Sequence, residues 1–352
     1  MKRFPALFAC MAFAATLGFG FSAAQAADLS SLKPISITIA HSEAGDPTNH
    51  IHGAALAFKE FAEAKSGGKI SVKVAAGGAL GDADACMMQV MSGTLEIAGS
   101  IADGSFSAVY PDTLVFSIPY LFRNDLHAMQ VVHGEFGKKL WADYAQATGT
   151  QMLASVSAGF RSTTNSKRPI KSADDFKGLK IRTMNMPAHM EIMKALGANV
   201  TPLSWTELYS ALQTGVIDGQ ENGLASIYMG NLYEVQKYLT LDGHVWTIDA
   251  FIMSSSWLES LPEPYRAIVE MGGLVMQEVM ARLCDAQTDI AMEFLPTVMD
   301  VYTPTRAELD SYRDACQKPV LEFIRKNVKN PALVDEVLAA ADKALVDLGY
   351  KK

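Results

Sequence analysis

The chain has 352 residues, with 30 Lys or Arg against 38 Asp or Glu and a formal net charge of −8. This acidic balance, without any run of basic residues, argues against nucleic acids and anionic membranes as partners, and any anion site must create its own positive field. The length exceeds what one ordinary hydrophobic core accommodates and predicts two domains or lobes.

The first 26 residues have the pattern of a secretory signal peptide. Lys2 and Arg3 precede an apolar run over residues 6–21, and residues 24–26 (AQA) offer small side chains for cleavage. The apolar run is shorter than the roughly 20 residues of a membrane helix. We therefore expect residues 1–26 to be removed and the rest to be a soluble exported protein, with an uncleaved anchor as the alternative.

Three cysteines lie beyond this segment, namely Cys86, Cys284 and Cys316. An odd number allows at most one disulfide within the chain, and the spacings match no zinc pattern. We expect buried free thiols, with a Cys284–Cys316 bridge as the alternative.

The first predicted elements form a β-α-β unit. Residues 35–39 and 69–75 alternate apolar and polar, and residues 50–61 carry apolar side chains at helical spacing. His41 follows the first strand at the edge where open α/β sheets place ligands, so it is a candidate pocket residue. His50 and His52 are two apart and point to different helix faces, which predicts surface histidines and no metal site.

Residues 82–106 predict a helix over 83–91 capped by Asp82, a strand over 94–98, and then a loop. Asp103 and Phe106 follow that strand and are candidate pocket residues. The glycines at 77, 78 and 81 lack the Lys and Ser/Thr of a phosphate-binding loop and are predicted to form turns.

The remaining elements alternate between the two lobes. The pattern predicts a helix over 125–147, a strand over 152–157 that crosses to the second lobe, an extended segment over 162–167, a short helix after Ser172, a strand over 179–183, helices over 187–196 and 206–215, a return strand over 244–256, and helices over 262–293, 306–327 and 331–348. Ser204 or Thr206 is expected to cap the helix that follows. The helix over 262–293 is long enough to span both lobes, and Gly272-Gly273 is a possible bend in it.

Two arginines are placed at predicted strand ends. Arg161 follows an apolar run and a glycine, and Arg182 closes a short strand. A planar guanidinium binds a carboxylate through two parallel hydrogen bonds, which a lysine ammonium cannot copy. Arg182 is therefore a candidate carboxylate clamp, with Arg161 as a second donor; the alternative is a surface Arg182 paired with Glu191.

Several motifs, in order along the chain, resemble one family. They are GALGD (78–82), YP (110–111), DDFKGLKIR (174–182), LGAN (196–199), ELYSALQTGVIDGQEN (207–222) and YEVQKY (233–238). From about residue 35 onward the chain resembles the periplasmic solute-binding proteins of TRAP transporters, of the DctP type. The resemblance implies a periplasmic binding protein with membrane permease subunits as partners, no cofactor, and an aromatic residue, here Trp205, that covers the solute.

The predicted fold class is α/β, a two-lobe periplasmic binding protein fold with a long helix spanning both lobes. Residues 27–158 with 248–287 are expected to form lobe I, and residues 159–247 with 288–352 to form lobe II, in a monomer. The expected ligand-binding residues are Arg182, Arg161, Asn222, Asn185, Trp205, His41, Trp246, Asp103, Phe106 and Met186.

The aromatic and methionine residues expected near the site favour an organic carboxylate with an aromatic or apolar tail, since a sugar acid would need more amides and acids. A sugar acid or a C4-dicarboxylate is the alternative. A periplasmic hydrolase is a further alternative, and against it the sequence has neither a Gly-x-Ser-x-Gly elbow nor a His-Glu-x-x-His motif.

Overall fold

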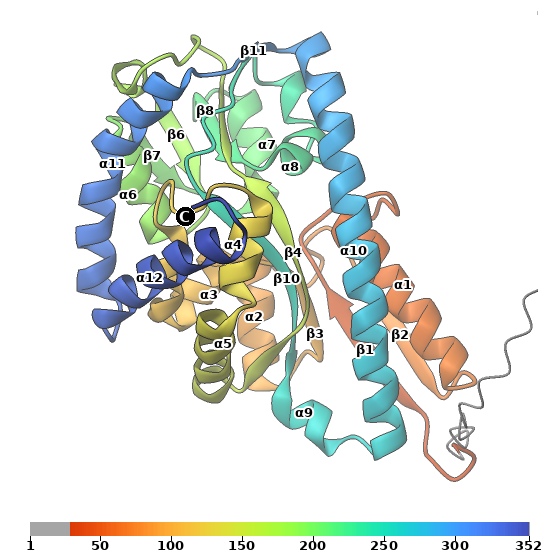
Figure 1. Cartoon of the computed structure of the whole chain (residues 1–352). Helices are drawn as coiled ribbons and strands as arrows, with labels where there is room; N and C mark the ends of the chain where they lie inside the picture. The colour runs from red at the N-terminus through yellow and green to blue at the C-terminus, as the bar shows by residue number, and fades with distance from the viewer. Residues whose placement is uncertain (1–28, 352) are drawn as a thin grey trace, which may run out of the picture.

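The computed structural model describes residues 29–351 as a mixed α/β protein with two β-sheets (Figure 1). The five-stranded sheet has the order β2-β1-β3-β10-β4, and the six-stranded sheet has the order β11-β9-β5-β8-β6-β7. The strands of the first are β1 (Ile35–Ala40), β2 (Ile70–Ala75), β3 (Ile97–Ala102), β4 (Thr150–Phe160) and β10 (Trp246–Ser254). Those of the second are β5 (Ser162–Asn165), β6 (Lys180–Thr183), β7 (Asn199–Pro202), β8 (Gly219–Asn222), β9 (Tyr238–Thr240) and β11 (Asp300–Tyr302). The predicted signal peptide lies outside the described residues.

The predicted β-α-β unit is confirmed. β1 and β2 pair in parallel with Ile35 opposite Ile70, and helix α1 (His50–Lys65) connects them. The Asn49 side chain accepts hydrogen bonds from the backbone N–H groups of Ile51 and His52 and so caps the helix. Apolar residues of β1 and α1 such as Ile37 and Phe58 are fully buried, which follows from the alternation and the helical spacing read from the sequence.

The helices around the first sheet are α2 (Ala83–Ser92), α3 (Asp103–Val109), the 3-10 helix η1 (Pro111–Ser117), α4 (Asp125–Val132), α5 (Glu135–Thr148) and α9 (Ser255–Ser260). Asp82 caps α2 as predicted, through its carboxylate and the Ala85 N–H. The helix predicted over 125–147 is two helices, because the chain turns sharply at Gly134. A Cβ there would lie 2.2 Å from the Gln130 carbonyl oxygen, so only glycine fits this turn.

The second sheet is surrounded by η2 (Ala173–Phe176), α6 (Pro187–Ala195), α7 (Trp205–Gln213), α8 (Leu224–Met229) and η3 (Leu232–Glu234). Ser172 caps η2, and Ser204 caps α7 in a reciprocal capping box with Glu207. Of the two caps considered for α7, Ser204 is the one in place, so Trp205 is the first residue of that helix.

Helix α10 (Glu263–Val298) is 36 residues long and connects the two lobes, as predicted. It packs against α1 and β4 of the first lobe and against α8 of the second (Figure 1). The helix continues without interruption through Gly272 and Gly273. Cβ atoms at these positions would lie 2.9 Å from the Phe58 ring and 2.5 Å from a Leu153 methyl carbon, so the glycine pair serves close packing.

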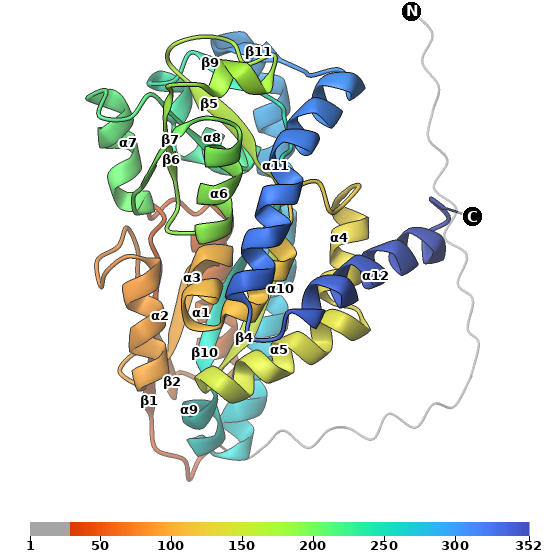
Figure 2. The same ribbon diagram turned by 90° about the vertical axis from the view of Figure 1, so that its left-hand side faces the viewer.

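The last two helices return from the second lobe to the first. α11 (Arg306–Asn327) packs on α6, and α12 (Ala332–Asp347) packs on α4, α5 and η1 (Figure 2). The predicted division placed residues 288–352 with lobe II, whereas α12 contacts helices that cover the first sheet. The apolar residues that α12 buries, such as Val334 and Val337, give this helix a partner surface there.

The cysteines Cys86, Cys284 and Cys316 are buried and free, as predicted, and the alternative Cys284–Cys316 disulfide does not form. Within residues 29–351, the helices lack the combination of length and apolar character that crossing a bilayer requires.

Candidate functional site

A cavity of about 350 Å³ lies between the two lobes. This volume is near the lower end of the roughly 300–1,000 Å³ typical of ligand pockets, so it suits a small solute. The residues that line it are Ser42, Glu43, Asp82, Ala83, Asp84, Ser100, Ala102, Gly104, Ser105, Ala158, Arg161, Arg182, Met184, Asn185, Pro202, Leu203, Ser204, Trp205, Glu207, Asn222, Ser226 and Asp249.

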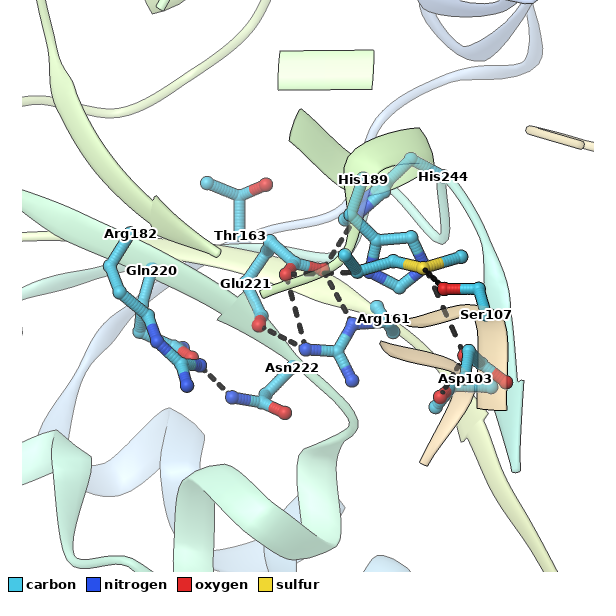
Figure 3. A network of polar contacts seen from close by, with 12 residues as sticks. Asp103, Ser107, Arg161, Thr163, Arg182, His189, Gln220, Glu221, Asn222 and His244 are labelled. Carbon is cyan, nitrogen blue, oxygen red and sulfur yellow. Dashed lines mark hydrogen bonds and ion pairs between the residues drawn. The ribbon is translucent and has the colours of Figure 1, made fainter. Parts of the chain in front are cut away.

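The second sheet supplies the cationic side of the cavity. β6 and β8 run parallel with Arg182 opposite Gln220, so the carboxyl ends of both strands meet at one edge. Arg182 lies near the end of β6, Asn185 follows it, and Asn222 is the last residue of β8. The Asn222 amide nitrogen donates to Gln220 Oε1 at 2.7 Å, which fixes the orientation of the amide (Figure 3).

Arg182 is 2% exposed and is held by a backbone carbonyl. Its Nε and Nη2 atoms donate to the Leu203 oxygen at 2.9 and 2.6 Å. Burial lowers the pKa of the guanidinium to about 10, and the more distant Glu221 opposes this shift. Glu191, the partner considered from the sequence, pairs with Lys194 instead. Since the described residues place no carboxylate within ion-pairing distance of Arg182, a buried and unpaired cation faces the cavity.

Arg161 also lines the cavity, but its charge is already matched. Its Nε donates to Glu221 Oε2 at 2.5 Å, and its Nη2 donates to Oε1 at 3.1 Å and to the Glu221 carbonyl oxygen at 2.6 Å (Figure 3). Burial opposes ionisation of Glu221, yet Arg161 and the histidines His189 and His244 hold the pKa of this carboxyl well below its ordinary value. A bidentate, buried pair of this kind fixes the Arg161 guanidinium in one position.

A second layer of buried polar groups supports this pair. His244 Nε2 lies 3.1 Å from Glu221 Oε2, and its Nδ1 lies 2.8 Å from Asp242 Oδ2. Burial would lower the pKa of His244, but Asp242 and Glu221 outweigh it and raise the pKa to about 9. Asp242 in turn accepts hydrogen bonds from the Thr163 N–H and hydroxyl. Hydrogen bonds from β5 and from the segment before β10 therefore hold the Arg161–Glu221 pair in place.

His189 lies between two carboxyl groups from different lobes. Its Nδ1 is 3.7 Å from Glu221 Oε1, and its Nε2 is 3.9 Å from Asp103 Oδ2. Asp103 accepts a hydrogen bond from the Thr247 hydroxyl at 2.6 Å, and burial raises the pKa of its carboxyl. Asp103 is thus one of the buried polar residues behind the cavity wall and does not line the cavity.

Five of the residues expected to bind ligand lie together on the cavity wall: Arg161, Arg182, Asn185, Trp205 and Asn222. The other five do not line it. His41 is buried beside His52, with 3.0 Å between His41 Nε2 and His52 Nδ1. Asp103 is buried below the wall, as described above.

The other three lie in the hydrophobic core for clear packing reasons. Phe106 packs edge-on against Trp141 and Tyr144. The Trp246 indole N–H donates to Asp125 Oδ1 and to the Ser157 hydroxyl, and the residue is 2% exposed. Met186 is fully buried, with its sulfur 3.1 Å from the hydroxyl of Ser107, a residue of α3.

His50 corrects another expectation, since it is 3% exposed and not a surface residue. Its Nε2 lies 3.0 Å from Asp249 Oδ2 and its Nδ1 lies 3.0 Å from Gln287 Oε1, a residue of α10. Asp249 is one of several acidic and hydroxyl residues of the first lobe that line the cavity and that the sequence did not single out. One sequence signal for these first-lobe residues was the end of strand β1, where a ligand was expected. His41 was predicted to reach the cavity from there, but the next two residues, Ser42 and Glu43, are the ones that line it.

A second cavity, of about 440 Å³, is lined by Asp46, Thr48, Tyr228, Met229, Asn231, Tyr233, Leu283, Ala286, Gln287 and Ile290. This lining contains neither Lys nor Arg, so it offers no cation to a carboxylate. Residues 29–351 also contain no group of His, Cys, Asp and Glu placed to hold a metal ion. The arginine-bearing cavity is therefore the candidate solute site.

A family model described as DctP, bacterial extracellular solute-binding protein, family 7, matches residues 40–327. A solute-binding protein of Verminephrobacter eiseniae is 37% identical over 215 residues, which cover 61% of this chain and 64% of that protein. The 2,3-diketo-L-gulonate-binding periplasmic protein YiaO of Escherichia coli is 29% identical over 304 residues, covering 84% of this chain and 88% of YiaO. The matched segments span less than two thirds of the length of some curated relatives.

Among solved structures, the chain is similar to the sugar acid binding protein DctPAm from Advenella mimigardefordensis in complex with galactonate. The TM-score is 0.83 at 32% identity, and the match covers 89% of this chain and 99% of that one. Structures of this kind are two-lobe solute-binding proteins, which agrees with the two sheets and the long α10 described above.

Proposed function

Because the chain belongs to the DctP family of bacterial extracellular solute-binding proteins, we propose that it captures a sugar acid between its two lobes and delivers it to the permease of a TRAP transporter. The family consists of solute-binding proteins, and this chain is one of them, not an enzyme. The periplasm is the compartment in which such a protein meets both its solute and its membrane partner, and the predicted signal peptide would take it there.

The observation that carries the proposal is the unpaired Arg182 guanidinium in a cavity between two lobes. A buried cation costs several kcal/mol unless a counter-charge reaches it, and a solute carboxylate supplies that charge. The Leu203 oxygen occupies the Nε and Nη2 side of the fork. The Nη1 end is then available to a carboxylate, with the Asn185 and Asn222 amides on the same wall as further hydrogen-bond partners.

The cavity lining supports a sugar acid more than the aromatic carboxylate favoured from the sequence. Trp205 is its one aromatic residue, whereas five serines and five carboxyl side chains face the cavity. Of the five residues that motivated the aromatic preference, Trp205 and Met184 line the cavity, whereas Phe106, Trp246 and Met186 are buried elsewhere. Hydroxyls and carboxylates are the groups that hydrogen-bond sugar hydroxyls, and a single indole is enough to cover one face of a small solute.

The test is a calorimetric titration of the purified protein with galactonate, benzoate and phenylacetate under identical conditions. We expect galactonate to bind at least about 100-fold more tightly than either aromatic acid, equivalent to about 2.7 kcal/mol. Tighter binding of an aromatic acid would overturn the sugar acid assignment. Carboxylate capture itself would be overturned if the protein bound none of these acids and mass spectrometry found no carboxylate that had co-purified with it.

A further inference from the structure

The cavity has two chemically different ends. The second lobe contributes the guanidinium groups of Arg161 and Arg182, whereas the first lobe contributes no cation among its described lining residues. Instead, the first lobe presents hydroxyl and carboxyl groups, namely Ser42, Glu43, Asp82, Asp84, Ser100, Ser105 and Asp249. A solute that spans the cavity must satisfy a positive end and an acidic, hydroxyl-rich end together.

We propose that Glu43, Asp249 and Ser42 of the first lobe bind hydroxyl groups at the end of the solute remote from its carboxylate and exclude a second carboxylate. The solute class is therefore a hydroxylated monocarboxylate and not a C4-dicarboxylate. This inference rests on the proposed function, because it assumes that the carboxylate of the solute binds Arg182.

Asp249 is held so that part of its carboxylate remains available. His50 lies 3.0 Å from Oδ2, and His50 itself is fixed by Gln287 of α10, whose amide donates to the Thr48 carbonyl oxygen. The other oxygen, Oδ1, makes no hydrogen bond to any residue of the described chain, and the side chain keeps 18% exposure. A rigid carboxylate with one free oxygen on a cavity wall is an acceptor for a solute hydroxyl.

Glu43 and Ser42 continue the same surface at the carboxyl end of β1. The Glu43 carboxylate accepts a hydrogen bond from the Asn49 amide at 3.3 Å, and burial raises the pKa of this carboxyl to about 7. Near neutral pH the group therefore exists in both forms and can accept or donate. The Ser42 hydroxyl is buried, with the residue 5% exposed, and has no hydrogen-bond partner within residues 29–351. An unpaired buried hydroxyl gains a bond when a solute hydroxyl reaches it.

A hydroxyl matches this surface better than the alternatives, because it both donates and accepts. A second carboxylate would bring like charge against Asp249 and Glu43, and the described first-lobe lining has no Lys, Arg or His to offset it. His50 lies behind the wall and is already bound to Asp249 Oδ2. A methylene chain would leave the Ser42 hydroxyl and the free Asp249 oxygen without partners. Discrimination of this kind is large, since sites built to bind a hydroxyl reject analogues that lack it by factors of about 10⁴.

The experiment measures the dissociation constants of galactonate, hexanoate and succinate by calorimetry for the whole mature protein and for the near-isosteric variants Glu43→Gln and Asp249→Asn. Galactonate and hexanoate have the same number of carbons, so they differ at the hydroxyls alone. The exposed residue Glu60 of α1 lies outside the cavity, and Glu60→Gln is the matched control. Melting temperatures of all variants check that they are folded.

We expect the wild type to prefer galactonate over hexanoate and succinate by about 100-fold or more, and the control to keep this preference. Each of the two cavity variants should reduce the preference for galactonate over succinate by about tenfold or more. The ratio of two affinities measured on one variant is insensitive to a general loss of active protein.

A ratio unchanged in both variants would overturn the assignment of Glu43 and Asp249 while leaving carboxylate capture intact. Wild-type binding of succinate or hexanoate as tight as that of galactonate would also overturn it, as would a preference for a zwitterion such as ectoine, whose cation would occupy the acidic end. Failure of every carboxylate to bind would count against the proposed function, so the two failures are distinguishable.

Discussion

Glu221 accepts hydrogen bonds from two nitrogens of Arg161 at the wall of the cavity, with 2.5 Å from Nε to Oε2 and 3.1 Å from Nη2 to Oε1. Both residues are almost fully buried. Because this pair is internally neutral, the unpaired positive charge on the cavity wall is that of Arg182.

Removing one partner of this pair should destabilise the protein strongly. Glu221→Gln leaves the Arg161 charge buried without a counter-ion, and such changes cost about 3–5 kcal/mol. Urea unfolding followed by circular dichroism measures the loss. The exposed pair of Glu278 and Arg282 provides the control, because Glu278→Gln should leave the unfolding midpoint nearly unchanged. A Glu221→Gln midpoint equal to that of the control would contradict this account of the buried pair.

His244 should make stability depend on pH on the alkaline side of neutrality. Its pKa is raised to about 9 from an ordinary value of 6.5, so its contribution is complete below pH 6.5 and is lost as the pH rises through 9. At about 1.4 kcal/mol for each pKa unit, the loss is on the order of 3 kcal/mol. Unfolding free energies of wild type and His244→Asn, measured between pH 6 and 9.5, should converge as the pH rises. Curves that stay parallel would show that His244 does not titrate in this range.

The secondary structure followed from the sequence wherever the pattern was local. The alternation in β1, the caps at Asp82 and Ser204, and the helical spacing in α10 depend on neighbouring residues alone, and the structure has them. The break at Gly134 depends on a close backbone approach that no periodicity records. The packing of α12 on the first lobe is a long-range contact and lies outside what such patterns encode.

The lining of the cavity was predictable where a strand end fixed the direction of a side chain, as for Arg182 and Asn222. It was not predictable along β10, because residues 246–254 are almost all buried and their pattern does not show which face a side chain joins. Trp246 was expected in the cavity, whereas the structure places Asp249 there and Trp246 in the core. The two residues are three apart in an extended strand, so they point to opposite faces.

Trp205 should affect binding more than stability. It is partly exposed at the start of α7, lines the cavity, and rests against Gly230, where a Cβ would lie 2.9 Å from the indole ring. Trp205→Ala should weaken galactonate binding by about tenfold, since a face of the sugar loses its cover, and should lower the melting temperature only slightly. Calorimetry and thermal unfolding of the same variant separate the two effects. A core role predicts the reverse, with a loss of about 3–5 kcal/mol in stability and unchanged affinity.

Binding should also compact the protein, because the solute contacts both lobes and favours the state in which they approach. In this structure the lobes meet beside the cavity, where a Cβ on Gly78 would lie 3.0 Å from a Thr206 methyl carbon. Small-angle X-ray scattering should show a smaller radius of gyration with saturating galactonate than without it. Identical curves would indicate a cavity that is closed before the solute arrives.

The most direct test of the account is the affinity of Arg182→Lys for galactonate, measured by calorimetry beside the wild type. The substitution keeps the charge but removes the planar fork, so we predict a loss of about 100-fold, or about 2.7 kcal/mol, with the melting temperature preserved. Arg282→Lys, at an exposed position of α10, is the matched control and should bind like the wild type. An Arg182→Lys affinity within about threefold of the wild type would contradict the assignment of the solute carboxylate to Arg182.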